Sequence, residues 1–160
     1  MRTYNTIIRP IVLYASEAWT LTKELEAKLM VFENNILRKI YGPIYDPEVG
    51  EWRRRHNQEL RDASQQPRII DIVKRNQLRW AGHVARMPVD RIPRKVMLGQ
   101  VDGRWPRGRP QLRWQERIEE EVCKRTDDIR PSKNLVEDRR LWRQLALADR
   151  GPHLAQDPPE

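Results

Sequence analysis

The sequence predicts an all-α fold of about five helices, joined by one long connector rich in proline, glycine and arginine. Three observations predict this class. Apolar residues recur at steps of three and four in several segments, and prolines or glycines end those segments. Hydrophobic residues make up 38% of the 160 residues and charged residues 34%. The core must therefore be thin and the surface polar.

The clearest predicted helix follows Thr22, the expected N-cap, and ends at Gly42 and Pro43. Residues 4–15, before it, suit a mostly buried helix that Pro10 must kink or confine to its first turn, with a short strand as the alternative. The apolar residues that repeat at steps of 4, 3, 4 and 4 in the clear helix are Leu25, Leu29, Phe32, Ile36 and Ile40.

Residues 43–50 are predicted as a loop, and residues 51–66 as a polar stretch with a possible short helix. From Pro67 to Met87 the pattern predicts one long helix, which Pro88 stops. At about 100° per residue, two sides of this helix differ. The apolar side holds Ile69, Val73, Trp80, Val84 and Met87. An arginine row without acidic residues holds Arg68, Arg75, Arg79 and Arg86.

The arginine row has two interpretations. It is either a solvated face, the usual interpretation of a charged helix side, or a surface that binds phosphates. The absence of local acidic partners supports the second, and both stay open. His83 lies near the edge of the row, where a structural role at the helix end is favoured over a hydrogen bond to phosphate.

The connector spans residues 88–110 and contains seven prolines and glycines. Only VMLGQV within it suggests a strand or a helical turn. A helix is predicted to resume at Gln111, with Trp114, Ile118 and Val122 on one face. A last helix, Ser132 to Ala148, is predicted to be capped by Ser132 and to bury Leu135, Trp142 and Leu145. Residues 151–160 are expected to be a disordered tail.

Positive charge is concentrated in the middle of the chain. The net charge of +8 arises from +4 over residues 51–90 and +6 over residues 91–114, whereas residues 1–50 are neutral and residues 115–160 carry −2. A polyanion is the natural partner of such a region, because Lys and Arg neutralise phosphates and release counterions. The alternative is a basic surface without a fixed partner.

Several classes of site are not expected. Cys123 is the only cysteine, and His56, His83 and His153 lack metal-ligand spacing, so neither a disulfide nor a structural metal is predicted. The adjacent acidic pair Asp127-Asp128 lacks the strand context of a polymerase metal site. No cofactor motif and no apolar run of about 20 residues is present. We expect no catalytic site, no cofactor and no membrane partner, and a nuclear or cytoplasmic protein that is not secreted.

The segment GRWPRGRPQLRW, residues 103–114, is the most basic motif. Its core, Pro106 to Pro110, matches an AT-hook, in which an extended Arg-Gly-Arg lies in a narrow minor groove. A rigid turn between helices is the competing interpretation. The residues expected to grip nucleic acid here are Arg104, Arg107, Arg109 and Arg113, and Trp105 is expected to stack on a base.

Three segments in the same order resemble the region downstream of the polymerase core in non-LTR (LINE-like) retrotransposon endonuclease-reverse transcriptases. They are residues 4–43, residues 78–97 (LRWAGHVARMPVDRIPRKVM) and residues 103–114. DRRLWRQLA, residues 138–146, resembles their C-terminal end. Where the usual pattern has glycine, this chain has Ala15. The family's endonuclease, fingers and palm, with an aromatic-x-Asp-Asp metal site, have no counterpart in these residues.

The resemblance implies a thumb-like helical segment over residues 1–43, a connector over 44–66 and a basic helical C-terminal region over 67–150. The implied function is the nucleic-acid-binding part of an RNA-directed DNA polymerase, without its catalytic domains. Its partners would be duplex DNA or RNA–DNA hybrid and the missing polymerase domains. Two alternatives stay open: a stand-alone AT-hook-like DNA-binding module, and a non-functional helical remnant with an exposed apolar patch around Ile7, Ile11 and Tyr14.

Overall fold

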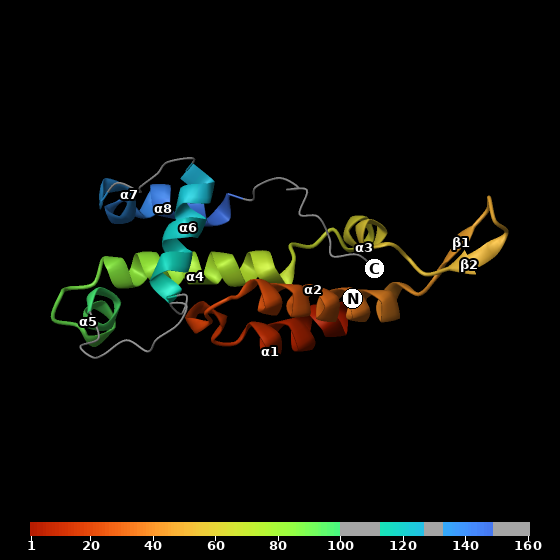
Figure 1. The fold of residues 1–160 in the computed structure, drawn as a ribbon, viewed down its shortest axis with the longest axis horizontal. Coiled ribbons are helices and arrows are strands. Elements are labelled where there is room, and N and C mark those ends of the chain that lie inside the picture. The colour runs from red at the N-terminus through yellow and green to blue at the C-terminus, as the bar shows by residue number, and fades with distance from the viewer. Residues whose placement is uncertain (100–112, 127–132, 149–160) are drawn as a thin grey trace, which may run out of the picture. The chain divides into compact units, whose positions relative to one another are not determined.

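The computed structural model of the chain describes residues 1–99, 113–126 and 133–148, and these are mostly helical (Figure 1). The predicted all-α class is confirmed, with one small two-stranded sheet added. The elements in chain order are η1 (Tyr4–Ile8), α1 (Arg9–Leu13), η2 (Ser16–Ala18), α2 (Lys23–Tyr41), β1 (Ile44–Asp46), β2 (Glu51–Arg53), α3 (Asn57–Ser64), α4 (Ile69–Ala85), α5 (Ile92–Leu98), α6 (Trp114–Thr126), α7 (Lys133–Glu137) and α8 (Arg139–Leu147).

The chain divides into two compact units. Unit 1 consists of Met1–Tyr14 and Thr22–Ile72, and unit 2 consists of Ala15–Leu21 and Val73–Glu160. Each unit has buried residues of its own. In the part of the chain that the structure describes, no helix is both long and apolar enough to span a membrane.

Unit 1 begins with a π-helical turn, η1, that runs directly into α1. Pro10 lies in the first turn of α1, where its missing N–H costs no helical hydrogen bond. Tyr4 and Arg9 are buried, so one side of this segment packs. The expectation of a mostly buried helix is wrong for the other side. There Ile7, Ile11 and Tyr14 are 54%, 70% and 82% exposed.

Helix α2 has the boundaries that its end signals predict. Thr22 Oγ1 accepts a hydrogen bond from the backbone N of Leu25 at 3.2 Å, which caps the N-terminus. Gly42 ends the helix with φ +66°, a conformation that glycine adopts without strain. The apolar repeat is not a continuous buried stripe, because Leu25 and Phe32 remain exposed while Leu37 is buried.

A buried carboxylate, Glu33, organises unit 1. Tyr4 Oη donates a hydrogen bond to Glu33 Oε1 at 2.9 Å, and the backbone N of Ile69 donates to Glu33 Oε2 at 3.1 Å. The second bond caps the N-terminus of α4 with a side chain from α2. Burial raises the pKa of Glu33, and the hydrogen bonds from Ile69 and Tyr4 act in the opposite direction. Arg9, also buried, donates to the backbone carbonyl of Pro67.

Residues 44–53 form an antiparallel hairpin, so the prediction of a loop over 43–50 is wrong, whereas residues 51–66 do contain the short helix that was considered possible there. Tyr45 pairs with Trp52 across strands β1 and β2, and their ring centroids lie 5.6 Å apart. Cross-strand aromatic contact stabilises such a pair. The helix of this region begins only at Asn57, as α3.

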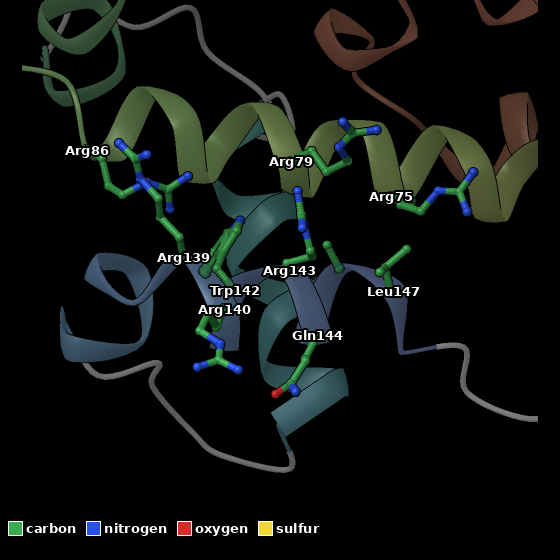
Figure 2. A pocket seen from close by; sticks show the side chains of 10 residues that line it. Arg75, Arg79, Arg86, Arg139, Arg140, Trp142, Arg143, Gln144 and Leu147 are labelled. Atoms are coloured by element: carbon green, nitrogen blue, oxygen red, sulfur yellow. The ribbon is translucent and has the colours of Figure 1, made fainter.

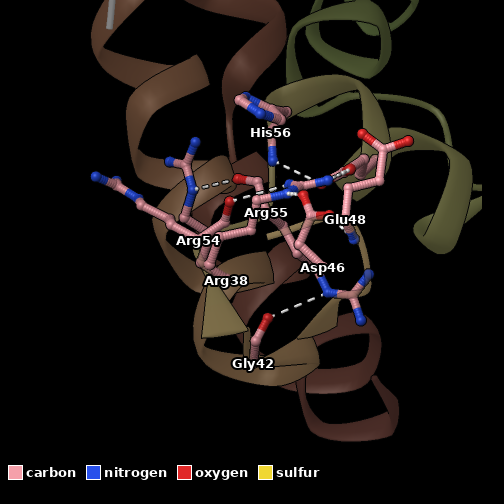
Figure 3. A network of polar contacts seen from close by, with 9 residues as sticks. Arg38, Gly42, Asp46, Glu48, Arg54, Arg55 and His56 are labelled. Carbon is pink, nitrogen blue, oxygen red and sulfur yellow. Dashed lines mark hydrogen bonds and ion pairs between the residues drawn. The ribbon is translucent and has the colours of Figure 1, made fainter. Parts of the chain in front are cut away.

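Arginines hold the hairpin in place. Arg53 Nε donates to Asp46 Oδ2 at 2.8 Å, and Arg53 Nη2 donates to Glu59 Oε1 at 2.7 Å. These contacts lower the pKa of Glu59 to about 2, with the hydrogen bond from Arg53 as the largest cause. Arg55 Nε donates to the carbonyl of Gly42 at 3.1 Å, and Arg38 Nε donates to the carbonyl of Arg55 at 3.3 Å (Figure 3).

Unit 2 has an apolar core built from three helices. The predicted single helix between Pro67 and Pro88 is confirmed as α4, and its buried side packs on α6 and α8. Trp80 was expected on that buried side, but it is 39% exposed. The core residues are Leu78, Ala81, Ile118, Val122, Trp142, Leu145 and Ala146, with Trp114, Leu135 and Val136 packed against them.

Trp142 fits against a glycine of α4. Its Nε1 donates to the carbonyl of Leu78 at 2.8 Å. A Cβ atom at Gly82 would lie 2.1 Å from the same Nε1, a distance that no packing tolerates. Gly82 therefore gives the indole access to the backbone of α4, and this contact fixes α8 beside α4.

The segment around η2 joins unit 2 through side-chain hydrogen bonds. Gln77 Nε2 donates to the carbonyl of Trp19 at 2.6 Å, and Trp114 Nε1 donates to the carbonyl of Glu17 at 2.9 Å. Arg117 Nε donates to the carbonyl of Leu21 at 2.8 Å. These bonds give partners to backbone carbonyls of the η2 segment and hold residues 15–21 against α4 and α6.

Two elements near the C-terminus differ from expectation. The predicted helix from Ser132 to Ala148 is interrupted, because Asp138 is extended and caps a new helix, α8. Its Oδ1 accepts from the backbone N of Arg140 at 2.7 Å and of Leu141 at 3.1 Å. Within the predicted connector, residues 92–98 form α5, with Pro93 in its first turn.

Candidate nucleic-acid interface

The arginine row of α4 lines an open groove in unit 2. Arg75, Arg79 and Arg86 all contribute to it. Arg68, the fourth member of the predicted row, lies in unit 1, where its guanidinium Nη1 is 3.9 Å from the sulfur of Met30. Three of the four predicted residues are thus brought together.

Helix α8 supplies the other wall. Figure 2 shows Arg139 and Arg143 extending from α8 toward α4. The groove has a volume of about 790 Å³. Its lining residues are Arg75, Arg79, Arg86, Arg139, Arg140, Trp142, Arg143, Gln144, Ala146 and Leu147. Six arginines, from α4, the turn that follows it and α8, therefore line one space, and the apolar part of its described lining belongs to α8.

Two contacts of α8 place its arginines. The indole of Trp142, seated against Gly82, sets the separation of α8 from α4. The Asp138 cap sets the start of α8, which places Arg139 and Arg140 in its first turn. Cations at a helix N-terminus oppose the helix dipole, so these two arginines do not stabilise α8. An anion bound there would neutralise the two guanidinium charges and interact favourably with the N-terminus of α8.

The electrostatics of the groove favour an anion. Among the described residues that line it, none is acidic. Partial burial lowers the pKa of Arg86, and the positive charge of Arg139 lowers it further. Arg86 Nη1 donates to the carbonyl of Val136 at 2.9 Å, which holds its guanidinium at the groove. Phosphate oxygens accept the paired N–H groups of guanidinium in a bidentate geometry.

Comparison with known proteins finds a distant relative of the sequence. It is 30% identical over 144 residues to an uncharacterized transposon-derived protein of Caenorhabditis elegans (F52C9.6). The chain is distantly homologous to a transposon-derived protein. The match covers 87% of this chain and 50% of the relative, so the chain spans about half the relative's length. No protein-family model matches the chain, and no solved structure matches it.

The remaining predicted binding residues lie elsewhere. Arg113 is exposed just before α6, and its backbone N donates to Glu116 Oε2 at 3.2 Å. Arg104, Trp105, Arg107 and Arg109 lie outside the described residues, together with the AT-hook-like motif. Their binding role stays a prediction. Within residues 1–99, 113–126 and 133–148, no three His, Cys, Asp or Glu side chains gather as metal ligands.

Sequence reasoning missed the arginines of α8. They lie in the segment 115–160, whose net charge of −2 hides a local basic face. A signal was present in DRRLWRQLA, where Arg139 and Arg143 are one helical turn apart and flank Trp142. That signal identifies a basic face on α8 but does not show which helix lies opposite.

Proposed function

We propose that this chain is the nucleic-acid-binding C-terminal part of a transposon-derived reverse transcriptase of the non-LTR type. Its role would be to hold the sugar-phosphate backbone of duplex DNA or RNA–DNA hybrid while other domains of the parent protein carry out the chemistry. The single observation that carries this proposal is the groove of six arginines between α4 and α8, in which none of the lining residues that the structure describes is acidic.

A polymeric anion fits this groove better than a small one. The positive charge of six guanidinium groups exceeds the negative charge of a single phosphate group, and the six arginines are distributed along α4, the turn that follows it and α8. Successive phosphates of one strand offer negative charge at regular intervals, so each arginine can meet an oxygen in turn. Contacts of this kind fix a protein on the backbone without reading sequence. We therefore expect binding with little sequence preference.

The transposon relative and the family resemblance support the reverse transcriptase part of the proposal. The relative is described as transposon-derived, and the match covers 87% of this chain. Residues 78–97 and 138–146, which carry part of the resemblance, include Arg79, Arg86, Arg139, Arg140 and Arg143. The residues that resemble the family and the residues that form the groove thus overlap. Catalysis would belong to the endonuclease and polymerase domains.

A salt titration tests the proposal. Binding of the chain to duplex DNA and to RNA–DNA hybrid is measured over a range of salt concentrations. The double variants Arg75→Ala/Arg79→Ala and Arg139→Ala/Arg143→Ala each remove two groove arginines. Each lost phosphate contact should flatten the slope of log K against log salt by about 0.9 on B-DNA, so each double variant should flatten it by about 1.8.

A matched control removes the same charge elsewhere. Arg2 and Arg54 are exposed in unit 1, and Arg2→Ala/Arg54→Ala lowers the net charge by the same amount. The control slope should stay close to that of the parent. Equal slopes in the groove and control variants would show that the groove does not bind phosphate. Circular dichroism checks that every variant keeps its helix content.

One observation favours a second candidate, the non-functional remnant. Ile7, Ile11 and Tyr14 are 54%, 70% and 82% exposed, which that hypothesis predicts. The same exposure suits a surface that contacts another domain of a parent polymerase. The titration separates the two candidates, because a remnant would bind neither duplex nor hybrid with a groove-dependent slope.

A further inference from the structure

Two aromatic rings lie exposed on α4 beside the arginine row. Trp80 is 39% exposed and His83 is exposed, and their ring centroids are 5.6 Å apart with the planes tilted by 45°. Trp80 is absent from the buried cluster of unit 2, in which Trp142 is a member and Trp114 a packed neighbour. Exposed tryptophan surface is costly in water and is enriched where proteins bind partners.

Helix geometry places these rings beside Arg79, on the side of the arginine row away from Gly82 and α8. At about 100° per residue, His83 lies roughly 40° around the helix from Arg79, and Trp80 lies roughly 60° beyond His83. Along the axis, His83 is about 6 Å from Arg79, and Trp80 about 1.5 Å. The helix surface therefore passes from the guanidinium of Arg79 to the two rings within about one turn. A strand whose phosphates contact Arg79 would bring its bases within reach of the rings.

We propose that Trp80 and His83 form a stacking platform for an unpaired base of a nucleic acid whose phosphates lie in the arginine groove. The path of the phosphates rests on the proposed function given above. The ligand of the platform is a nucleotide of single-stranded DNA or RNA, or of an unpaired end. Every base has a flat π face, so the platform recognises strandedness and not sequence.

The platform selects single strands because only unpaired bases have a face free to stack on a protein ring. In a duplex each base is stacked between its neighbours, so its faces are not available to a protein ring. In a single strand they are free, and stacking on tryptophan or histidine adds affinity. Duplex would engage only the arginines, whereas single strands would engage both the arginines and the platform.

The test compares one tryptophan of unit 2 with one of unit 1. Trp52 is 70% exposed on the hairpin and contacts Tyr45, so Trp52→Ala is a matched control for Trp80→Ala. Fluorescence anisotropy gives the affinity of each variant for a single-stranded oligonucleotide and for a blunt duplex of equal length. Trp80→Ala should weaken single-strand binding about tenfold and change duplex binding less than about twofold.

Further variants sharpen the result. Trp80→Phe keeps a flat ring and should recover most of the single-strand affinity, and His83→Ala should lose less than Trp80→Ala. Trp52→Ala should change neither affinity. Unchanged duplex binding by Trp80→Ala also shows that the variant is folded. Equal losses on both ligands, or no loss on either, would overturn the platform.

The platform and the groove fail in different ways. If Arg75→Ala/Arg79→Ala weakens binding to both ligands while Trp80→Ala weakens neither, the groove stands and the platform is wrong. If the arginine variants bind as the parent does, or if the parent binds neither ligand, both the proposed function and the platform are overturned.

Discussion

The two units of this protein use their charged residues differently. Lys and Arg outnumber Asp and Glu by 11 to 9 in unit 1 and by 20 to 14 in unit 2. In unit 1 several arginines bond acceptors within the fold, as Arg53 does with Asp46 and Glu59. In unit 2 six arginines line a groove whose lining, over the described part of the chain, contains no acidic residue.

The interiors of the two units also differ in polarity. Unit 1 buries a carboxylate, Glu33, and a guanidinium, Arg9, and joins its helices through their hydrogen bonds. Unit 2 joins α4, α6 and α8 through an apolar cluster around Trp142. Arginines paired with carboxylates of the fold stabilise it, whereas arginines that line a groove with no acidic residue among its described lining can bind an outside anion. The comparison identifies unit 2 as the candidate binding unit.

The largest effect is expected at Gly82. Gly82→Ala places a methyl group 2.1 Å from Trp142 Nε1, so the indole must leave its position. We expect the free energy of unfolding of unit 2 to fall by about 3 kcal/mol. Native-state hydrogen exchange of the Leu78 and Val122 amides measures this change. In a Trp142→Leu background the further cost of Gly82→Ala should be much smaller, because the clash is gone. An equal cost in both backgrounds would contradict the close fit.

A smaller effect is expected at Glu33. Glu33→Leu leaves the hydroxyl of Tyr4 and the backbone N–H of Ile69 without their acceptor, which should destabilise unit 1 by about 2 kcal/mol. Glu33→Gln keeps an acceptor oxygen and should cost less than about 1 kcal/mol. Urea unfolding, with exchange of the Leu37 and Leu60 amides as the local probe, measures both. A Gln variant as unstable as the Leu variant would show that charge, and not hydrogen bonding, is what unit 1 requires.

The smallest effect is a pH dependence of the hairpin. Arg53 lowers the pKa of Glu59 from 4.5 to about 2. A folded pKa below the unfolded one means that ionised Glu59 adds stability above pH 4.5, and that this stability is lost as pH falls to about 2. The indole NMR signal of Trp52 should follow this transition. Asp46, whose pKa is also lowered, contributes in the acid range, so Glu59→Gln should reduce the pH dependence and Asp46→Asn should reduce it independently. If the pH profile of the Trp52 signal is the same in both variants and in the parent, the ion pairs of Arg53 with Glu59 and Asp46 do not cause the pH dependence.

Local signals in the sequence predicted the long helices well. Thr22 and Gly42 bound α2, and Pro67 and Pro88 bound α4, because caps and prolines act on their own backbone. The hairpin was not predictable from strand propensity, since β1 and β2 are only three residues each. Side-chain contacts hold the hairpin. Arg53 bonds Asp46 of β1 and Glu59 of α3, and Arg55 donates to the carbonyl of Gly42.

The sequence by itself determined which side of α4 carries arginines, because the helical period alone aligns Arg75, Arg79 and Arg86. The tertiary structure decided what faces that side. Trp142 fits against Gly82 and brings Arg139 and Arg143 of α8 to the same groove. It also decided that Trp80, apolar in the pattern, lies exposed. Periodicity records which residues share a side of one helix, but only packing between helices selects the side that is buried.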